Sequence, residues 1–228
     1  MPERSRTRRR PRATLSIQSH TMNELTALFT DTPGATLLLA AMIAFSLYGL
    51  RVAPALIERN LFRPHWLLPQ RQYKTLVTSG FLHADMTHLL MNAFTFWAFA
   101  FGLERSMDTP RFLALYLFGL LVSDAGTWLA HLHEPEYRSL GASGAILAVL
   151  FASIIYHPSA SLFILPIPYP IPAPLFALGY LAYSWYASRQ ARGNVNHDAH
   201  LSGAVAGVLF VALTDFDTLA RALRKFFS

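Results

Sequence analysis

The chain has 228 residues, of which 53% are hydrophobic and 14% are charged, and its net charge is +6. Soluble domains are about 25% charged, so this composition argues against a large soluble domain and favours a protein with several membrane spans. The sequence contains no cysteine, which excludes disulfides, thiolate nucleophiles and cysteine-ligated metals.

Much of the positive charge lies at the N-terminus, where residues 4–12 include six arginines. By itself such a cluster also fits nucleic-acid binding. Beside a membrane span, the positive-inside rule and the attraction of arginine to anionic lipid favour a cytoplasmic tail. We therefore expect residues 1–33 to form a basic cytoplasmic tail at the lipid bilayer of a bacterial inner (plasma) membrane, with no nucleic-acid partner.

Six apolar stretches approach the length of about 20 residues that a helix needs to cross a bilayer. They cover roughly residues 34–55, 86–103, 112–132, 143–157, 172–187 and 199–213. The sequence therefore predicts an all-α, polytopic membrane protein, with a six-helix bundle in residues 34–216 and a short cytoplasmic tail in residues 217–228.

Two connections between these spans are unusual. Residues 56–82 mix aromatic and basic residues over a long loop, which is typical of a segment at the membrane surface or partly inserted in it. In residues 165–174 proline stands at every second position, so this stretch is expected to be extended. Proline is tolerated in the first turn of a helix, and we expect the fifth helix to begin at Pro172–Pro174.

The polar residues within the apolar sequence gather at the starts of the second, fourth and sixth spans. If the N-terminal tail is cytoplasmic, these three starts share the outer side of the membrane. The second span opens with His88 and Asn92, which are four residues apart and so share a helix face. The fourth opens with Ser143 and the sixth with His200. Because polar side chains in a membrane are costly, we expect them to face one interior site.

These residue types suit hydrolysis by an activated serine. Ser143 lies between glycines in residues 141–145, at a helix start where backbone N–H groups lack internal partners. Serine becomes a good nucleophile when a base takes its proton, and His200 is the best-placed base. Asn92, His88 and the N–H of Ser143 are candidate donors to the oxyanion of a tetrahedral intermediate.

Three short motifs carry these residues in a fixed order. They are His83-x4-His88-x3-Asn92, Gly141-Ala142-Ser143-Gly144-Ala145 and Ala199-His200-Leu201-Ser202-Gly203-x3-Gly207. With these motifs the chain resembles the rhomboid family of intramembrane serine proteases over about residues 34–216. The segment Gly102-Leu103-Glu104-Arg105 also looks like the acidic end of that family's second helix.

The resemblance implies a serine endopeptidase with a catalytic dyad of Ser143 and His200 and no acid. It also implies that His88 and Asn92 stabilise the oxyanion. We expect no metal or other cofactor to take part. The expected substrates are single-span membrane proteins, cut near the outer membrane face where their helix can unwind. A small residue is expected before the scissile bond.

Two positions depart from the pattern of this family. Rhomboids often carry a tyrosine four residues after the serine, packed on the histidine ring, and this chain has Leu147 there. The ring of His200 is then positioned by aliphatic packing or by another aromatic residue. Rhomboids also often have Trp-Arg about nine residues before the first histidine of the second helix. Tyr73-Lys74-Thr75 stands there instead, so the first loop is expected to be anchored differently.

Structural interpretations compete with the catalytic ones at several positions. An isolated serine such as Ser143 is often only a helix cap, but the flanking glycines and the later His200 favour a nucleophile. For Gly203 and Gly207 we predict a structural role, because small residues spaced in this way let two membrane helices approach closely.

The remaining polar residues are assigned structural roles. His83 is expected to hold the loop before the second helix. His197, His200 and His88 are an alternative set of metal ligands, which we disfavour because no carboxylate or cysteine evidently completes a site. The polar loop at residues 131–136 is expected to be solvated, and the charges at residues 104–111 are expected to pair at the cytoplasmic interface.

Two other classes of function compete with proteolysis. One is a catalytically impaired rhomboid-like protein that binds membrane partners, for which Leu147 is the best support. The other is a proton-coupled transporter with the histidines as a relay. That class predicts inverted repeats and interrupted helices, and we find neither in the sequence.

Overall fold

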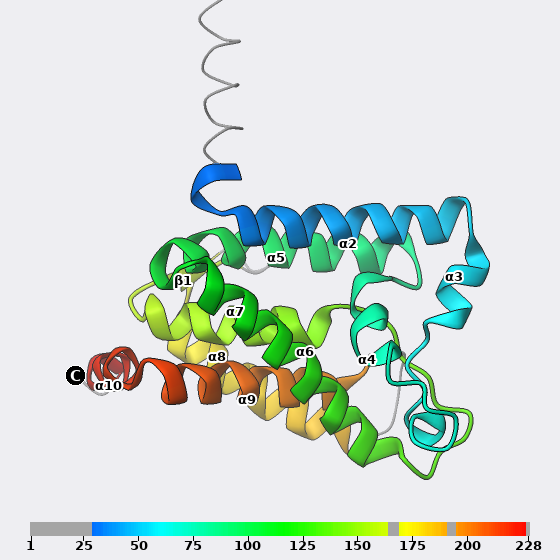
Figure 1. The fold of residues 1–228 in the computed structure, drawn as a ribbon. Coiled ribbons are helices and arrows are strands. Elements are labelled where there is room, and N and C mark those ends of the chain that lie inside the picture. The colour runs from blue at the N-terminus through cyan, green and yellow to red at the C-terminus, as the bar shows by residue number, and fades with distance from the viewer. Residues whose placement is uncertain (1–28, 164–168, 191–194, 227–228) are drawn as a thin grey trace, which may run out of the picture.

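The computed structural model describes residues 29–163, 169–190 and 195–226, and its architecture is a bundle of helices (Figure 1). The long helices are α2 (Pro33–Arg51), α5 (Met86–Met107), α6 (Thr109–His131), α7 (Ser143–Tyr156), α8 (Ala173–Ser188) and α9 (His197–Thr214). Each matches one of the six predicted spans to within a few residues, so the all-α prediction is confirmed. The arginine-rich N-terminal cluster lies outside the described residues.

The helices differ in how they meet their surroundings. Among the described residues, α2, α5, α6 and α9 are long and apolar enough to cross a membrane. Helix α7 has 14 residues, and every residue from Gly144 to Ile155 is buried, so it occupies the centre of the bundle. Large apolar side chains such as Leu37, Phe94 and Trp97 are exposed on the outer helices, as expected for surfaces that face lipid.

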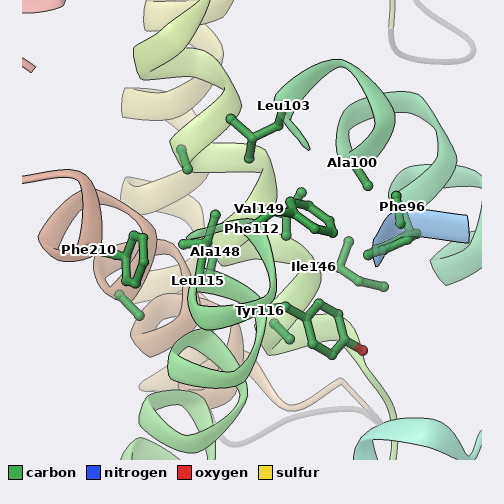
Figure 2. Close-up of a cluster of buried hydrophobic side chains, with 14 of the residues drawn as sticks. Phe96, Ala100, Leu103, Phe112, Leu115, Tyr116, Ile146, Ala148, Val149 and Phe210 are labelled. Atoms are coloured by element: carbon green, nitrogen blue, oxygen red, sulfur yellow. The ribbon is translucent and has the colours of Figure 1, made fainter. Parts of the chain in front are cut away.

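An apolar core joins α5, α6, α7 and α9 around the central helix. Figure 2 shows Phe96 of α5 beside Phe112 and Tyr116 of α6, with Ile146 of α7 and Phe210 of α9 in the same cluster. The rings of Phe96 and Tyr116 meet edge to face with centroids 5.8 Å apart, a favoured geometry for aromatic pairs. This core fixes the position of α7, whose first residue is Ser143.

The contact between α7 and α9 depends on glycine. A Cβ atom on Gly203 would overlap the carbonyl oxygen of Gly144, and one on Gly207 would overlap that of Ala148. The backbones of the two helices therefore touch, which is the contact that small residues allow between membrane helices. This confirms the predicted role of both glycines in α9.

Short helices form the long first loop and lie together at one end of the bundle (Figure 1). They are α3 (Pro54–Arg59), η1 (Pro64–Trp66), α4 (Thr75–Thr78) and η2 (Ser79–Phe81).

This long first loop is tied to the connection between α6 and α7. Phe62 and Ser139 exchange backbone hydrogen bonds of 3.0 and 2.9 Å, and the Trp66 indole donates to the Pro135 carbonyl at 3.1 Å. Tyr73 is exposed, so the loop is anchored through other residues.

The charged segment at the C-terminal end of α5 departs from expectation at Glu104. This side chain is 1% exposed, and its carboxylate accepts hydrogen bonds from the backbone N–H groups of Gly34 (2.9 Å) and Ala35 (2.6 Å). It thus caps the N-terminus of α2, where a negative charge is favourable. The expected interfacial pairing is wrong for Glu104, although Asp108 and Arg111 do form an exposed ion pair.

The opposite end of the bundle carries a short hairpin and a final helix (Figure 1). Strand β1 (Ser161–Leu162) pairs antiparallel with β2 (Ile171–Pro172), and Pro174 lies in the first turn of α8 as predicted. Of the predicted extended stretch, residues 165–168 lie outside the described residues. The C-terminal residues, expected only as a tail, include the strongly amphipathic helix α10 (Phe216–Phe226).

Candidate active site

Ser143 begins α7, two residues after a glycine that the local geometry requires. Gly141 has φ +123°, a conformation that L side chains rarely adopt. A Cβ there would also lie 2.7 Å from Cε1 of the His88 ring. Ala142 occupies the cap position of the helix. The hydroxyl of Ser143 is therefore not the N-cap of its own helix.

The structure brings Ser143 and His200 together. The Nε2 atom of His200 lies 2.9 Å from the Oγ atom of Ser143, and both residues are partly buried. Asn196 holds the start of α9 in place, because its side chain accepts from the Ala199 N–H at 3.0 Å and donates to the Thr127 hydroxyl of α6 at 2.9 Å. Residues 57 positions apart in the chain thus meet at the starts of two touching helices.

The other ring nitrogen of His200 contacts a residue that sequence analysis missed. Its Nδ1 atom lies 3.0 Å from the phenol oxygen of Tyr180 on α8. A neutral imidazole has one donor and one acceptor nitrogen. If Nε2 accepts a hydrogen bond from the Ser143 hydroxyl, Nδ1 carries the ring proton and donates a hydrogen bond to the phenol oxygen of Tyr180. The only sequence signal for such a residue was Leu147, whose apolar side chain left the ring in need of another partner.

Neither His88 nor Asn92 forms a described hydrogen bond with this pair. The His88 ring packs against Gly141, two residues before Ser143. Asn92 lies one turn further along α5 and is 7% exposed, and its Nδ2 atom has no hydrogen-bond partner among the described residues. A buried amide without a partner is costly, so Asn92 is a donor available to a bound group.

His83 has the structural surroundings expected for it. Its side chain is fully buried in the segment between η2 and α5, and its Nδ1 atom lies 2.9 Å from the Ser46 hydroxyl of α2. Its ring meets that of His88 edge to face, with centroids 4.8 Å apart. Burial, with a smaller contribution from His88, lowers the pKa of His83 to about 3. A neutral His83 thus links α2 to the site.

The loop after α6 is not simply solvated, and that expectation is wrong for His131. Its Nε2 atom lies 3.1 Å from a carboxylate oxygen of Asp198, and its Nδ1 atom lies 3.0 Å from Glu134. Its ring stacks on Tyr137 at 3.6 Å. Burial and the carboxylates of Asp198 and Glu134 raise the pKa of Tyr137. This cluster connects the end of α6 to the first turn of α9.

A small cavity adjoins the serine and contains a second group that sequence analysis missed. Its volume is about 20 Å³, and its lining includes Ser143, Asn196, Ser123 and Asp124, which is space for one water molecule. One carboxylate oxygen of Asp124 is buried without a hydrogen-bond partner among the described residues. An acidic residue in the middle of a predicted span is a recognised functional signal, and it could have pointed to Asp124.

The alternative metal site has no support in the described residues. They contain no group of three or more His, Asp or Glu side chains arranged to hold a metal ion. His197 and His200 pack edge to face with ring centroids 6.0 Å apart, and both nitrogens of His200 face protein hydroxyls.

Comparison with known proteins decides the family. Residues 70–215 match the model of the Rhomboid domain, and this range contains all of the residues of the candidate site. The chain belongs to the rhomboid family.

Three relatives of this rhomboid chain illustrate the extent of the similarity. It is 28% identical over 150 residues to RHOMBOID-like protein 12, mitochondrial, of Arabidopsis thaliana (59% of this chain, 44% of the relative). It is 29% identical over 160 residues to Rhomboid protein 1, mitochondrial, of Saccharomyces cerevisiae (65% and 45%). It is 31% identical over 146 residues to Presenilin-associated rhomboid-like protein A, mitochondrial, of Danio rerio (60% and 36%). The chain spans less than half the length of each.

Family membership and the apolar helices together identify a multi-pass integral membrane protein. The three relatives are named as mitochondrial proteins and give the expected bacterial inner membrane no support.

Proposed function

We propose that this rhomboid chain is an intramembrane serine endopeptidase in which Ser143 is the nucleophile and His200 the base. The observation that carries the proposal is the 2.9 Å contact between Oγ of Ser143 and Nε2 of His200. Nucleophile and base within hydrogen-bonding distance, with the base held by a third group, is the arrangement that activates a serine.

The proposed reaction follows from the positions of these groups. Oγ of Ser143 attacks the substrate carbonyl while its proton passes to Nε2 of His200. The oxyanion that forms accepts hydrogen bonds from the Ser143 N–H, His88 and the unpaired amide of Asn92. His200 then protonates the leaving amine. Water hydrolyses the acyl-enzyme by the reverse transfers, and the small cavity beside Ser143 has room for one such molecule.

The proposed substrates are single-span membrane proteins. Ser143 and His200 lie in the first turns of α7 and α9, at one end of the bundle, so a substrate helix that unwinds near a membrane face would present its backbone there. With the basic tail in the cytoplasm, this face is the outer one. A small residue before the scissile bond would fit between the closely packed helix starts. The expected plasma-membrane location remains a prediction from charge alone.

Cleavage by the reconstituted protein tests the proposal. The full-length chain is placed in liposomes with a fluorescent single-span peptide that has small residues near its outer end. We expect cleavage by the wild type and its loss in Ser143→Ala and His200→Gln. A matched control is Ser153→Ala, which removes another buried serine of α7 far from the helix start and should keep activity. Equal cleavage by wild type and Ser143→Ala would end the proposal.

The alternative is a catalytically impaired rhomboid-like protein that binds membrane partners. Leu147 favours it, because the tyrosine that often packs on the histidine is absent from that position. A fluorophosphonate probe separates the two, since it reacts with an activated serine and needs no substrate. Labelling that is lost in both Ser143→Ala and His200→Gln supports the protease, and absence of labelling in the wild type supports the binding protein.

A further inference from the structure

We propose that Tyr180 is the positioning residue of His200: its phenol oxygen holds the Nδ1–H group, and so keeps Nε2 directed at Ser143. This inference rests on the proposed function for its catalytic consequence, but the geometry and the tautomer that it assigns are independent of activity.

The residue at position 147 offers His200 no hydrogen-bond partner. Leu147 lies one turn after Ser143 on α7, is 7% exposed, and packs in an apolar cluster with Phe151 and, from α8, Tyr180. Its methyl groups fill space but offer no hydrogen-bond acceptor. The Nδ1 group of His200 must therefore find its acceptor on another helix, and the residue within 3.0 Å of it is Tyr180.

The ring of His200 must carry its proton on Nδ1 if Nε2 is to accept from Ser143. A histidine without a partner at Nδ1 exchanges between two neutral tautomers, and only the one protonated at Nδ1 can accept from serine at Nε2. An acceptor beside Nδ1 selects that tautomer and fixes the ring orientation. In the described surroundings of His200, the neighbouring His197 offers only an edge-to-face ring contact, so the selection falls to Tyr180.

Tyr180 is itself held in place by its neighbours. Its ring packs against Phe151 of α7 with centroids 6.1 Å apart and against Phe176, one turn earlier on α8, at 5.6 Å. One turn later, Ser184 is fully buried, and its hydroxyl interacts with the phenol group of Tyr180. It is thus a candidate acceptor for the phenol proton once the phenol oxygen accepts from His200. A row of four interacting side chains then spans three helices: Ser143 of α7, His200 of α9, and Tyr180 and Ser184 of α8.

The test compares Tyr180→Phe with Tyr186→Phe in the full-length protein. Both variants remove one hydroxyl from α8, but Tyr186 is exposed and its hydroxyl takes part in no described contact with His200. For Tyr180→Phe we expect kcat for the single-span peptide to fall about tenfold, the worth of one hydrogen bond, with KM unchanged. Tyr186→Phe should match the wild type. Equal thermal unfolding of the two variants shows that the fold is kept.

A second readout needs no catalysis. In protein labelled with ¹⁵N at histidine, the His200 ring signals, identified by their loss in His200→Gln, report which nitrogen carries the proton. We expect protonation at Nδ1 in the wild type and in Tyr186→Phe, and a mixture of tautomers in Tyr180→Phe.

The outcomes separate the two proposals. If the wild type neither cleaves nor labels, the proposed function fails and the ring spectra alone decide the role of Tyr180. A fall in kcat for Tyr180→Phe without a change of tautomer would overturn the positioning role. So would unchanged kcat and spectra in that variant.

Discussion

Helix α9 carries His200 and helix α8 contacts it, but the two helices are held in the bundle in different ways. Helix α9 buries seven residues and touches α7 backbone to backbone through Gly203 and Gly207. Helix α8 buries only Ala173 and Ser184, and a Cβ on its Gly179 would meet nothing within 4 Å. One helix places the histidine by steric fit, and the other contacts it through a side chain.

The distance from Ser143 to His200 and the orientation of the His200 ring are therefore fixed by different kinds of contact. The distance between Ser143 and His200 is set by main-chain contact, which few substitutions can adjust. The orientation of the His200 ring depends on Tyr180, a side chain that can be changed while the bundle stays intact. The two requirements can therefore be broken separately.

A substitution that pushes α7 and α9 apart should be the most damaging. In Gly203→Ala the new Cβ overlaps the backbone of Gly144, and overpacking of this kind costs about 3 kcal/mol. We expect a lower unfolding temperature in detergent micelles and loss of fluorophosphonate labelling, since His200 moves away from Ser143.

The matched control is the same substitution on the loosely packed helix. Gly179→Ala adds a methyl group to open space and should change stability by less than about 1 kcal/mol, in the stabilising direction, because alanine favours helix. Similar destabilisation by both variants would show that backbone contact is not what distinguishes α9 from α8.

A change of pH is expected to have a smaller effect on stability, through His83, which links α2 to the site. The pKa of His83 is lowered to about 3 in the folded protein, against about 6.5 in the unfolded chain. Between these values the unfolded state binds more protons, so the free energy of unfolding must fall as pH falls through this window. The loss is at most about 1.4 kcal/mol per pH unit. Stability is fully present above pH 6.5.

Urea unfolding of wild type and His83→Gln in micelles at several pH values between 4 and 7 measures this contribution. The variant should lose part of the pH dependence, while His133→Gln, a change in the polar loop, should keep it. Identical slopes for wild type and His83→Gln would refute the role assigned to His83.

The same comparison explains what the sequence could predict. The six helices follow from apolar stretches of spanning length, and the contact of α7 with α9 follows from the spacing of Gly203 and Gly207. The meeting of Ser143 and His200 was predictable because helix direction alternates in a membrane, which places polar helix starts on one side. Each of these features follows from a local sequence pattern or from the alternating direction of the helices.

Contacts between side chains of different helices were not predictable in this way. Glu104 caps α2, 70 positions earlier, and His131 pairs with Asp198, 67 positions later. No spacing rule relates such positions, because rotation of each helix about its axis decides which side chains meet. Tyr180 belongs to this group, since it lies in an apolar helix without a motif and is singled out only by its distance from His200.

The smallest expected effect is that of Leu147→Tyr, which places an aromatic ring where other rhomboids often have one. If His200 were held by aliphatic packing alone, this substitution should raise kcat. Because Tyr180 already holds Nδ1, we expect a change of less than about twofold in the wild-type background, about 0.4 kcal/mol. In the Tyr180→Phe background the same ring should recover part of the lost kcat, because it restricts the movement of the imidazole. Steady-state cleavage of the single-span peptide by the two single variants and the double variant measures the coupling. A large gain in kcat in the wild-type background would mean that Tyr180 leaves the His200 ring poorly positioned. The contact of α8 with His200 would then contribute little to the site, despite the hydrogen bond.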